Sequence, residues 1–369
     1  MRSPPVSRRR FLGQLSAASA LAFLPRTGRA QAVPSRKLGV VLVGLGRYAT
    51  NQLAPALRVT EHCRLAGVVT GDAAKGARWA QEHGFPEGNV WHYDRMDRIA
   101  GRPDVDIVYV VTPPGLHAPH SIAAARAGKH LICEKPMANT VAECDAILAA
   151  CAKAGVKHAI GYRLFWDPYH TELRRLAREG DFGPFMRLGG DRAFRINEWR
   201  WRVDKKLAGG GPLMDVGVYL IQGACMAKDG RAPVAVTATE LPKTRPDLFK
   251  DTEETIRWSM EWADGALAEF STSYQQNADW FRCEAPRGWM HFKSRAFGYV
   301  VAGPDTSRGP LDFGPPVNQQ ARQMDGFARH LLGLEPNPVP GEMGRRDLAI
   351  IEAIYASAAA GGTRVEVRA

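Results

Sequence analysis

The first half of the chain alternates short apolar runs with segments whose apolar residues recur at helical spacing. The apolar runs cover 38–43, 65–69, 107–111, 130–133 and 158–161, and the helical patterns lie at 53–59, 73–83, 117–127 and 141–154. Strands that alternate with helices build a parallel sheet covered on both faces. The pattern therefore predicts an α/β domain over 33–161.

The second half carries a different pattern, with consecutive strand-like segments at 185–196, 234–241, 255–262, 267–273, 280–284 and 289–292. Residues 262–266 are typical of a hairpin turn. Helical patterns at 319–332 and 346–359 close the chain, and 303–316 is expected to be a connector without regular structure. We therefore expect an α+β domain over 162–369, with a large, mostly antiparallel sheet that packs one face and leaves the other open.

The first 32 residues form a separate segment with six arginines and no acidic residue. Arg8, Arg9 and Arg10 precede a mildly apolar run that ends at Leu24, and Ala30 to Ala32 offers a small-x-small cleavage site. This order predicts a twin-arginine signal over 1–32, export of the folded protein by the twin-arginine machinery, and a periplasmic location. The alternative is a basic tail or a membrane-surface helix.

Charge and composition narrow the classes of partner. Without the first 32 residues the excess of basic over acidic side chains falls from 11 to 5, and no basic stripe interleaved with aromatics remains, so we expect no nucleic-acid partner. No apolar stretch reaches the roughly 18 to 20 residues of a spanning helix, so we expect no membrane contact after signal cleavage. The six cysteines lack metal-ligand spacing and are expected to be buried thiols without a metal, although a periplasmic disulfide stays open.

A Gly-rich turn follows the first predicted strand and opens a helix, as dinucleotide-binding βαβ units require. Gly44 permits the tight turn, Gly46 lets the backbone approach a pyrophosphate, and Ala49 takes the third small position. Arg47 and Tyr48 lie at the helix start, where exposed N–H groups favour anions. The first domain is therefore expected to be a Rossmann domain.

The end of the second predicted strand bears on the choice of cofactor. An NAD site usually places an acidic residue there, whereas this chain has Thr70 and Gly71, with the basic Lys75 and Arg78 close behind. Positive charges attract the 2′-phosphate of NADP(H), so we expect NADP(H). The alternative is that the two basic residues are a solvated helix face and that Asp72 supports NAD.

Three further segments combine polar residues with glycines at the ends of predicted elements, at 111–117, 133–136 and 209–219. With Glu134-Lys135-Pro136 and the segment from Gly209 to Tyr219, the chain resembles the Gfo/Idh/MocA oxidoreductases, in particular their glucose–fructose oxidoreductase-like branch, which includes aldose–aldose oxidoreductases. The resemblance covers essentially the whole mature chain, and 161–163 and 348–355 also match it.

The resemblance implies a Rossmann domain, a second domain with an open sheet, and hydride transfer at a carbon of a sugar or polyol. It implies that Lys135, Asp215 and Tyr219 act in the active site and that the bond before Pro136 is cis. Many members of the family have His where this chain has Tyr219, and Tyr is usual at this position in the glucose–fructose oxidoreductase-like branch. We expect the cofactor site to be completed by Thr112, Pro113, His117, Glu134, Lys135 and Arg163.

The residues support these roles on chemical grounds. Oxidation of an alcohol sends a hydride to the cofactor and a proton to a side chain. Asp215 and Tyr219 are four positions apart and share a helix face, and Gly217 between them would leave room for a nicotinamide ring. A Tyr pKa near 10 is too high for a base at neutral pH, and the ammonium of Lys135 would lower it. We expect Tyr219 to be the acid/base and Asp215 to orient the substrate or the lysine.

Candidates for substrate contacts are less specific. The main set is Lys135, Arg163, Trp199, Arg202, Asp215 and Tyr219, and further candidates are His117, Asp167, His170, Arg200 and Trp201. Tryptophan rings stack on sugar faces and arginines donate to hydroxyls, but core tryptophans and surface arginines give the same pattern.

Location changes the expected mechanism, because the periplasm has no pool of nicotinamide cofactor. The enzyme would hold NADP(H) with a Kd on the order of nanomolar, about −12 kcal/mol, and would oxidise one aldose to its lactone and reduce a second sugar to an alditol in a ping-pong scheme. The alternatives are a conventional NADP-dependent aldose dehydrogenase, an NAD-dependent glycosidase of the same family and a non-catalytic sugar-binding protein. An open sheet also predicts a homo-oligomer.

Overall fold

A computed structural model describes residues 36–368, and the predicted signal at 1–32 lies outside them. The first sheet has six parallel strands in the order β3-β2-β1-β4-β5-β6. They are β1 (Leu38–Val43), β2 (Cys63–Val69), β3 (Val90–Trp91), β4 (Ile107–Val110), β5 (His130–Cys133) and β6 (His158–Ile160). The predicted Rossmann-like parallel sheet is confirmed, and only the two-residue β3 is absent from the sequence pattern.

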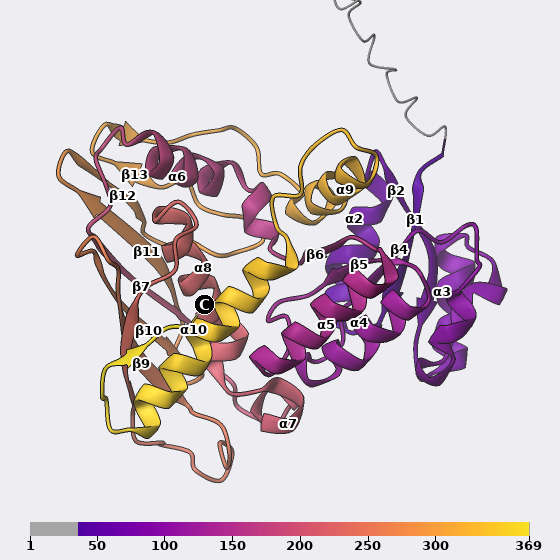
Figure 1. Cartoon of the computed structure of the whole chain (residues 1–369), viewed down its shortest axis with the longest axis horizontal. Helices are drawn as coiled ribbons and strands as arrows, with labels where there is room; N and C mark the ends of the chain where they lie inside the picture. The colour runs from indigo at the N-terminus through magenta and orange to yellow at the C-terminus, as the bar shows by residue number, and fades with distance from the viewer. Residues whose placement is uncertain (1–35, 369) are drawn as a thin grey trace, which may run out of the picture. The chain divides into compact units, whose positions relative to one another are not determined.

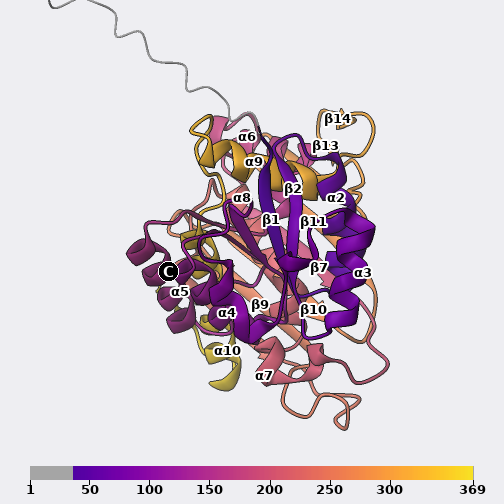
Figure 2. The same cartoon turned by 90° about the vertical axis from the view of Figure 1, so that its right-hand side faces the viewer.

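Helices cover both faces of this sheet, with α2 (Ala54–Val59) and α3 (Ala73–His83) on one side and α4 (His117–Arg126) and α5 (Val141–Ala154) on the other (Figure 2). The strands between them are buried on both faces, which explains their continuous apolar runs. Local signals set the helix ends: Thr140 and Glu143 form a capping box at the start of α5, and Gly155 ends it in the left-handed conformation.

The second sheet has nine strands in the order β14-β13-β12-β11-β7-β10-β9-β8-β15. They are β7 (Arg187–Ala193), β8 (Ala235–Glu240), β9 (Thr255–Glu261), β10 (Leu267–Ser273), β11 (Ala278–Ala285), β12 (Gly288–Phe292), β13 (Asp305–Thr306), β14 (Gly309–Pro310) and β15 (Val365–Glu366). The sheet is antiparallel except where β7 pairs with β10 in parallel. The predicted α+β domain is confirmed, whereas the expected connector at 303–316 contains β13 and β14.

Three helices pack on one face of this second sheet: α6 (Pro168–Glu179), α8 (Val218–Ala227) and α10 (Gly341–Ala359) (Figure 1). The hydrophobic pattern missed α6, and α10 begins five residues before its predicted start because its first turn is rich in glycine and charge. Within residues 36–368 no helix lies on the opposite face of the sheet.

The chain returns to the Rossmann domain near its C-terminus. Helix α9 (Gln319–Leu331) packs on α2 and β2, and the carboxylate of Asp325 accepts hydrogen bonds from the backbone of Glu61 and His62 at 2.9 and 2.8 Å. Helix α10 contacts α5 in the same way. These contacts hold the two sheets in a fixed relation, which is what a site between them needs. None of the helices in the described part of the chain is long and apolar enough to span a membrane.

Candidate active site

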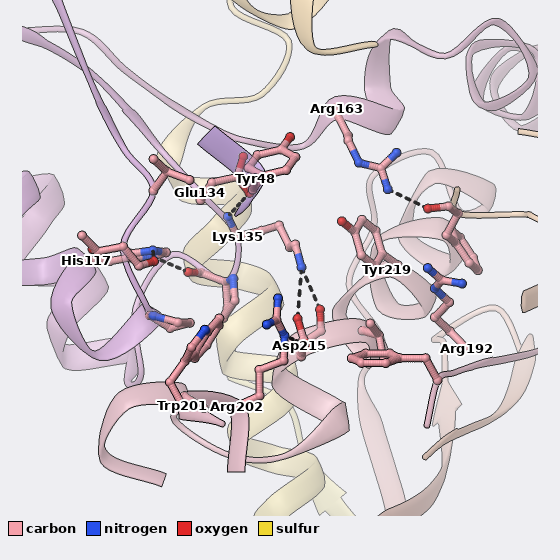
Figure 3. Close-up of a pocket in the computed structure, with 18 of the residues that line it drawn as sticks. Tyr48, His117, Glu134, Lys135, Arg163, Arg192, Trp201, Arg202, Asp215 and Tyr219 are labelled. Atoms are coloured by element: carbon pink, nitrogen blue, oxygen red, sulfur yellow. Dashed lines mark hydrogen bonds and ion pairs between the residues drawn. The ribbon is translucent and has the colours of Figure 1, made fainter. Parts of the chain in front are cut away.

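A cavity of about 290 Å³ lies where the loops after β1, β4 and β5 meet the start of α8 and the strand β7 (Figure 3). Its walls combine aromatic rings with both signs of charge. It is lined by Tyr48, Val111, Thr112, Pro114, His117, Glu134, Lys135, Pro136, Arg163, Arg192, Phe194, Trp201, Arg202, Ala208, Asp215, Val216, Tyr219, Phe297, Gly298 and Tyr299.

The Gly-rich turn lies at one edge of this cavity. Gly44 has a φ of +98°, and a Cβ there would approach within 3.0 Å of the Thr112 side chain, so only glycine fits. A Cβ on Gly46 would meet no atom within 4 Å, which leaves the backbone open to a close ligand. The helix that starts at Arg47 brings in Tyr48, whose ring lines the cavity and whose buried hydroxyl has no hydrogen-bond partner among the described residues.

The end of β2 lies beside this turn. Thr70 is buried and its hydroxyl accepts from the Asp72 amide at 3.2 Å, whereas Gly71 is exposed. The Asp72 carboxylate caps α3 by accepting from the Lys75 amide at 2.9 Å, and the Lys75 ammonium donates to the Leu45 carbonyl in the Gly-rich turn. The structure therefore brings Lys75 to the turn.

These features fit a nicotinamide dinucleotide. The open backbone at Gly46 and the helix start after it suit a pyrophosphate, the Lys75 ammonium adds a positive charge beside the turn, and the ring of Tyr48 lines the cavity. Arg47 and Arg78 are exposed on the helices that flank the turn. No carboxylate cluster that could hold a metal occurs among the described residues.

Lys135 and Asp215 are in direct contact in the cavity. The Lys135 Nζ donates to the Asp215 backbone carbonyl at 2.7 Å and lies 3.8 Å from Oδ1 of its carboxylate. The other carboxylate oxygen accepts from the Arg202 Nε at 2.8 Å and from the Tyr274 hydroxyl at 2.9 Å. Burial alone would raise the pKa of Asp215, but the charges of Arg202 and Lys135 and these hydrogen bonds hold it below its usual range.

Tyr219 lies against two cations. The Lys135 Nζ is 4.4 Å from the centre of the Tyr219 ring, and the Arg163 guanidinium is 5.2 Å from it. Burial alone would raise the pKa of Tyr219, but the positive charges of Arg163 and Lys135 outweigh burial and lower the pKa below its ordinary value. The sequence predicted this effect for Lys135, and the structure adds Arg163 as the stronger contributor.

Arg163 is almost completely buried and joins two parts of the site. Its guanidinium donates to the carbonyls of Phe297 and Gly298 at 2.6 and 2.8 Å and to the Gln319 side chain. The Phe297 ring in turn stacks on Tyr219 with 6.0 Å between ring centres. Arg163 therefore fixes the loop of Phe297 and Gly298 beside Tyr219.

Glu134 contacts the backbone of Lys135 from the interior of the protein. Its buried carboxylate accepts from the Tyr109 hydroxyl at 2.7 Å and from the Lys135 amide at 3.1 Å. Burial raises the pKa of Glu134. A Cβ on Gly161 would come within 2.5 Å of this carboxylate, so the glycine makes room for it. The bond between Lys135 and Pro136 is cis, as the resemblance implied.

A Gly-rich entry positions Asp215 and Tyr219. The chain turns at Gly209 and Pro212 into a wide helical turn, Leu213–Gly217, which continues as α8. Both side chains reach the cavity, as their spacing predicted. The expectation for Gly217 was wrong, because a Cβ there would meet the core side chains of Leu213 and Thr272 at 3.0 and 3.3 Å, so the glycine serves packing.

His117 and its neighbours form the wall after β4. Its ring nitrogens lie 2.9 Å from the Pro136 carbonyl and 2.7 Å from the Thr112 carbonyl, two acceptors of which a neutral imidazole can donate to only one. Burial lowers the pKa of His117 to about 4. Thr112 and His117 line the cavity, and Pro113 precedes the lining residue Pro114.

The substrate candidates separate into two groups. Trp201 and Arg202 line the cavity, whereas Trp199 is 66% exposed and Arg200 pairs with Glu198, and neither of these two lines it.

Two further substrate candidates, Asp167 and His170, have structural roles. The buried Asp167 carboxylate caps α6 and contacts the buried His170 ring at 3.1 Å, and neither residue lines this cavity.

Sequence reasoning missed several lining residues. Arg192 comes from β7, Phe194 follows the end of that strand, and Phe297, Gly298 and Tyr299 come from a loop. Tyr274, just after β10, does not line the cavity but donates to Asp215. The alternation along β7 places Arg192 and Phe194 on one face and is the only signal that could have grouped them. No local motif marks the loop, since its place depends on Arg163.

Comparisons with known proteins agree with this architecture. Residues 38–162 match the oxidoreductase family with an NAD-binding Rossmann fold, and residues 170–289 match the GFO/IDH/MocA C-terminal domain.

Three of the similar proteins are named for sugar substrates. The crystal structure of the aldose–aldose oxidoreductase from Caulobacter crescentus, complexed with glycerol, is 39% identical, covers 90% of this chain and 100% of that chain, and superposes with a TM-score of 0.86. The NADP⁺-dependent D-xylose 1-dehydrogenase of Haloarcula marismortui is 29% identical over 89% of this chain and 93% of its own length. A second such dehydrogenase, from Haloferax volcanii, is 27% identical over 87% of this chain and 97% of its own. This chain, with its Rossmann turn and its Lys135–Asp215–Tyr219 cluster, belongs to the Gfo/Idh/MocA oxidoreductase family.

Proposed function

We propose that this protein is an NADP(H)-containing aldose oxidoreductase of the periplasm that retains its cofactor between turnovers. The observation that carries the proposal is the position of Tyr219, a phenol lying against the cations Lys135 and Arg163 in a cavity that also borders the Gly-rich turn. The sugar substrates of the similar aldose–aldose oxidoreductase and xylose dehydrogenases support an aldose as substrate.

The side chains of the cavity divide the work of alcohol oxidation. A bound nicotinamide supplies the acceptor and donor of the hydride. Tyr219, with its lowered pKa, takes the proton of the substrate hydroxyl and returns a proton when a carbonyl is reduced. Lys135 holds the reacting oxygen near Tyr219, and Asp215, kept ionised by Arg202, fixes the lysine and accepts from a sugar hydroxyl.

Two contacts support NADP(H) as the cofactor. The carboxylate of Asp72, the residue that would otherwise bind the ribose hydroxyl of NAD, is engaged as the cap of α3. The ammonium of Lys75 lies at the Gly-rich turn, where it can meet a 2′-phosphate. The NADP⁺ dependence of the two similar xylose dehydrogenases points the same way.

Export explains why the cofactor would be retained. The twin-arginine pattern at 1–32 predicts delivery of a folded protein to a compartment without free nicotinamide cofactor. The proposed cycle is therefore ping-pong: one aldose loses two hydrogens and leaves as its lactone, and a second sugar gains two hydrogens and leaves as an alditol. The twin-arginine machinery and the two sugars are the proposed partners.

A homo-oligomer is proposed as the assembled form. In the described part of the chain, helices cover one face of the second sheet and leave the other without a helix. That uncovered face is the surface we expect two subunits to share, without nucleic acid or membrane as a partner.

The deciding experiment adds pairs of sugars to the purified mature protein without any added cofactor. We expect lactone and alditol in equal amounts, together with about one NADP(H) per chain released on denaturation. A conventional dehydrogenase, the alternative that the two xylose dehydrogenases favour, would be inert in this assay and active with one aldose plus NADP⁺. Inactivity under both conditions, or cleavage of an aryl glycoside, would contradict the proposal.

A further inference from the structure

Arg192 lies on the wall of the cavity formed by the second sheet. It belongs to β7 and stands directly opposite Asp279 of the neighbouring strand β11. Its Nη1 lies 2.7 Å from the Asp279 carboxylate, with the two side chains only 22% and 16% exposed. Because the arginine sits on a strand and is held by a largely buried carboxylate, its guanidinium is fixed in the cavity wall rather than mobile in solvent.

The same carboxylate connects Arg192 to the loop over Tyr219. The second oxygen of Asp279 accepts from the Phe297 amide at 3.0 Å, and the Phe297 carbonyl accepts from Arg163 at 2.6 Å. The position of the guanidinium is therefore set relative to the ring of Tyr219. In Figure 3 the two labelled side chains lie on the same side of the pocket.

Arg192 has more hydrogen-bond donors than its pairing with Asp279 uses. A guanidinium carries five N–H donors, and the carboxylate of Asp279 lies 2.7 Å from Nη1. The Nε of Arg192 has no hydrogen-bond partner among the described residues. A polar group in a cavity wall that the protein leaves incompletely satisfied is a group that a ligand can satisfy.

The role of Arg192 differs from that of the proton-transfer groups. Lys135 and Arg163 lie on the Tyr219 ring, whereas Arg192 is paired with its own carboxylate. The pair has no net charge, so it suits a neutral hydroxyl rather than an anion. The planar fork also gives the contact a fixed direction.

We propose that Arg192 determines which sugar this site accepts, by donating to a hydroxyl of the aldose on a carbon other than the one oxidised. The inference rests on the proposed aldose oxidoreductase activity. A site built to hydrogen-bond a substrate hydroxyl rejects analogues that lack it, because the buried donor is then left unpaired. The enzyme should therefore discriminate strongly against aldoses that are deoxy at one particular carbon.

The test measures kcat/KM for an aldose and for its monodeoxy analogues. Arg192→Met alone would strand the Asp279 carboxylate, so the informative variant is Arg192→Met combined with Asp279→Asn, in which the amide oxygen still accepts from Phe297. Asp279→Asn alone is the control that separates the effect of changing the carboxylate from the effect of losing the guanidinium. Arg329→Met is the matched control, because Arg329 lies on α9, pairs with Glu335 at 2.7 Å and does not line the cavity.

We expect the double variant to lose at least about 10-fold of the discrimination at one carbon, the scale of a hydrogen bond to a charged donor. Its kcat/KM for the complete aldose should fall mainly through KM, and the pH dependence of kcat should stay as in the wild type. Arg329→Met should change none of these values.

The inference is overturned if the discrimination stays unchanged in the double variant. This holds whether kcat/KM stays at the wild-type value or falls equally for the aldose and every deoxy analogue. A wild-type enzyme that turns over no aldose would overturn the proposed function and this inference together. If the wild type is active and the double variant discriminates as the wild type does, only this inference is overturned.

Discussion

The proton transfer proposed for this site depends on the balance of electrostatic effects at one phenol, that of Tyr219. Burial of Tyr219 disfavours the phenolate, and the carboxylate of Glu134 acts in the same direction. Arg163 and Lys135 act against both, and their combined effect is the larger. The site thus keeps Tyr219 buried and at the same time lowers its pKa toward the working range of an acid/base.

Tyr219→Phe removes the proton acceptor and keeps the ring that packs on Phe297. We expect turnover to fall by at least roughly 100-fold, the usual scale of an acid/base contribution. Bound cofactor per chain should stay unchanged, because the substitution alters no residue of the Gly-rich turn. Steady-state rates together with nucleotide content after denaturation measure both quantities. Near-normal turnover would remove Tyr219 from the mechanism.

Arg163→Met removes the cation that contributes most to lowering the pKa of Tyr219. The pKa of the phenol then rises, so the base form is reached only at higher pH and the rate of sugar oxidation near neutral pH falls. The measurement is the pH profile of kcat for oxidation, which we expect to move to higher pH.

Arg163→Lys is the control, since it keeps the positive charge while losing part of the hydrogen bonding to the loop. It should shift the profile less than Arg163→Met. If both variants lose activity equally without any shift of the profile, then Arg163 serves only to hold the loop.

At the scale of an element, the segment that leads into α8 depends on a buried carboxylate. Glu253 accepts from the amides of Gly211 and Leu213 at 2.9 and 3.0 Å and from the Tyr355 hydroxyl at 2.9 Å. It satisfies backbone donors at the start of the helical turn that carries Asp215. The glycines allow the contact, because a Cβ on Gly210 would come within 2.0 Å of the Tyr355 hydroxyl.

Gly210→Ala should therefore destabilise the protein by overpacking, at a cost of about 1–3 kcal/mol. Gly88→Ala is the matched control, because a Cβ at Gly88 meets no atom within 4 Å and the backbone there does not need a left-handed conformation. Thermal unfolding of the two variants gives the comparison. If the two variants unfold at the same temperature, the segment that leads into α8 relaxes freely and Glu253 does not hold it.

The sequence predicted those elements whose ends and periodicity are local. Helices α3 and α5 have the predicted first and last residues, because Asp72, Thr140, Gly84 and Gly155 mark their ends. The strands β3, β13, β14 and β15 are two residues long and carry no periodicity to detect. Their pairing is decided by neighbouring strands rather than by their own residues.

The residues of the site show the same difference between local signals and tertiary contacts. Lys135, Asp215, Tyr219 and the Gly-rich turn lie in local motifs, and the structure brings them to one cavity. Arg192 lies in a strand without any motif, and the sequence pattern favours Trp199 over its near neighbour Trp201 as a substrate contact, whereas only Trp201 lines the cavity. Which of two neighbouring tryptophans faces a cavity is set by tertiary packing, which a single sequence does not encode locally.

At the scale of the whole molecule, the cavity needs distant parts of the chain, since its walls come from the segments after β1, β4 and β5, the helix start at Asp215 and a loop near Phe297. Helix α9 then returns to the Rossmann domain, and the Gln323 side chain donates to the Tyr109 hydroxyl at 2.6 Å, which itself donates to Glu134. A ligand in this cavity therefore contacts parts of both sheets and binds only the folded state.

Removal of the cofactor should for that reason lower the thermal stability of the whole protein. A ligand that binds only the folded state stabilises it by about 4 kcal/mol at a thousandfold excess over its Kd, which corresponds to roughly 5 °C or more in the unfolding midpoint of a chain of this size. We expect the protein as isolated to unfold in one transition and the cofactor-stripped protein to unfold earlier, with NADP⁺ restoring the midpoint better than NAD⁺. Lys75→Met should reduce that difference between the two nucleotides, because it removes the ammonium beside the Gly-rich turn. Identical midpoints before and after stripping would instead mean that the cofactor exchanges freely, and the retained-cofactor cycle would then have to give way to that of a conventional dehydrogenase.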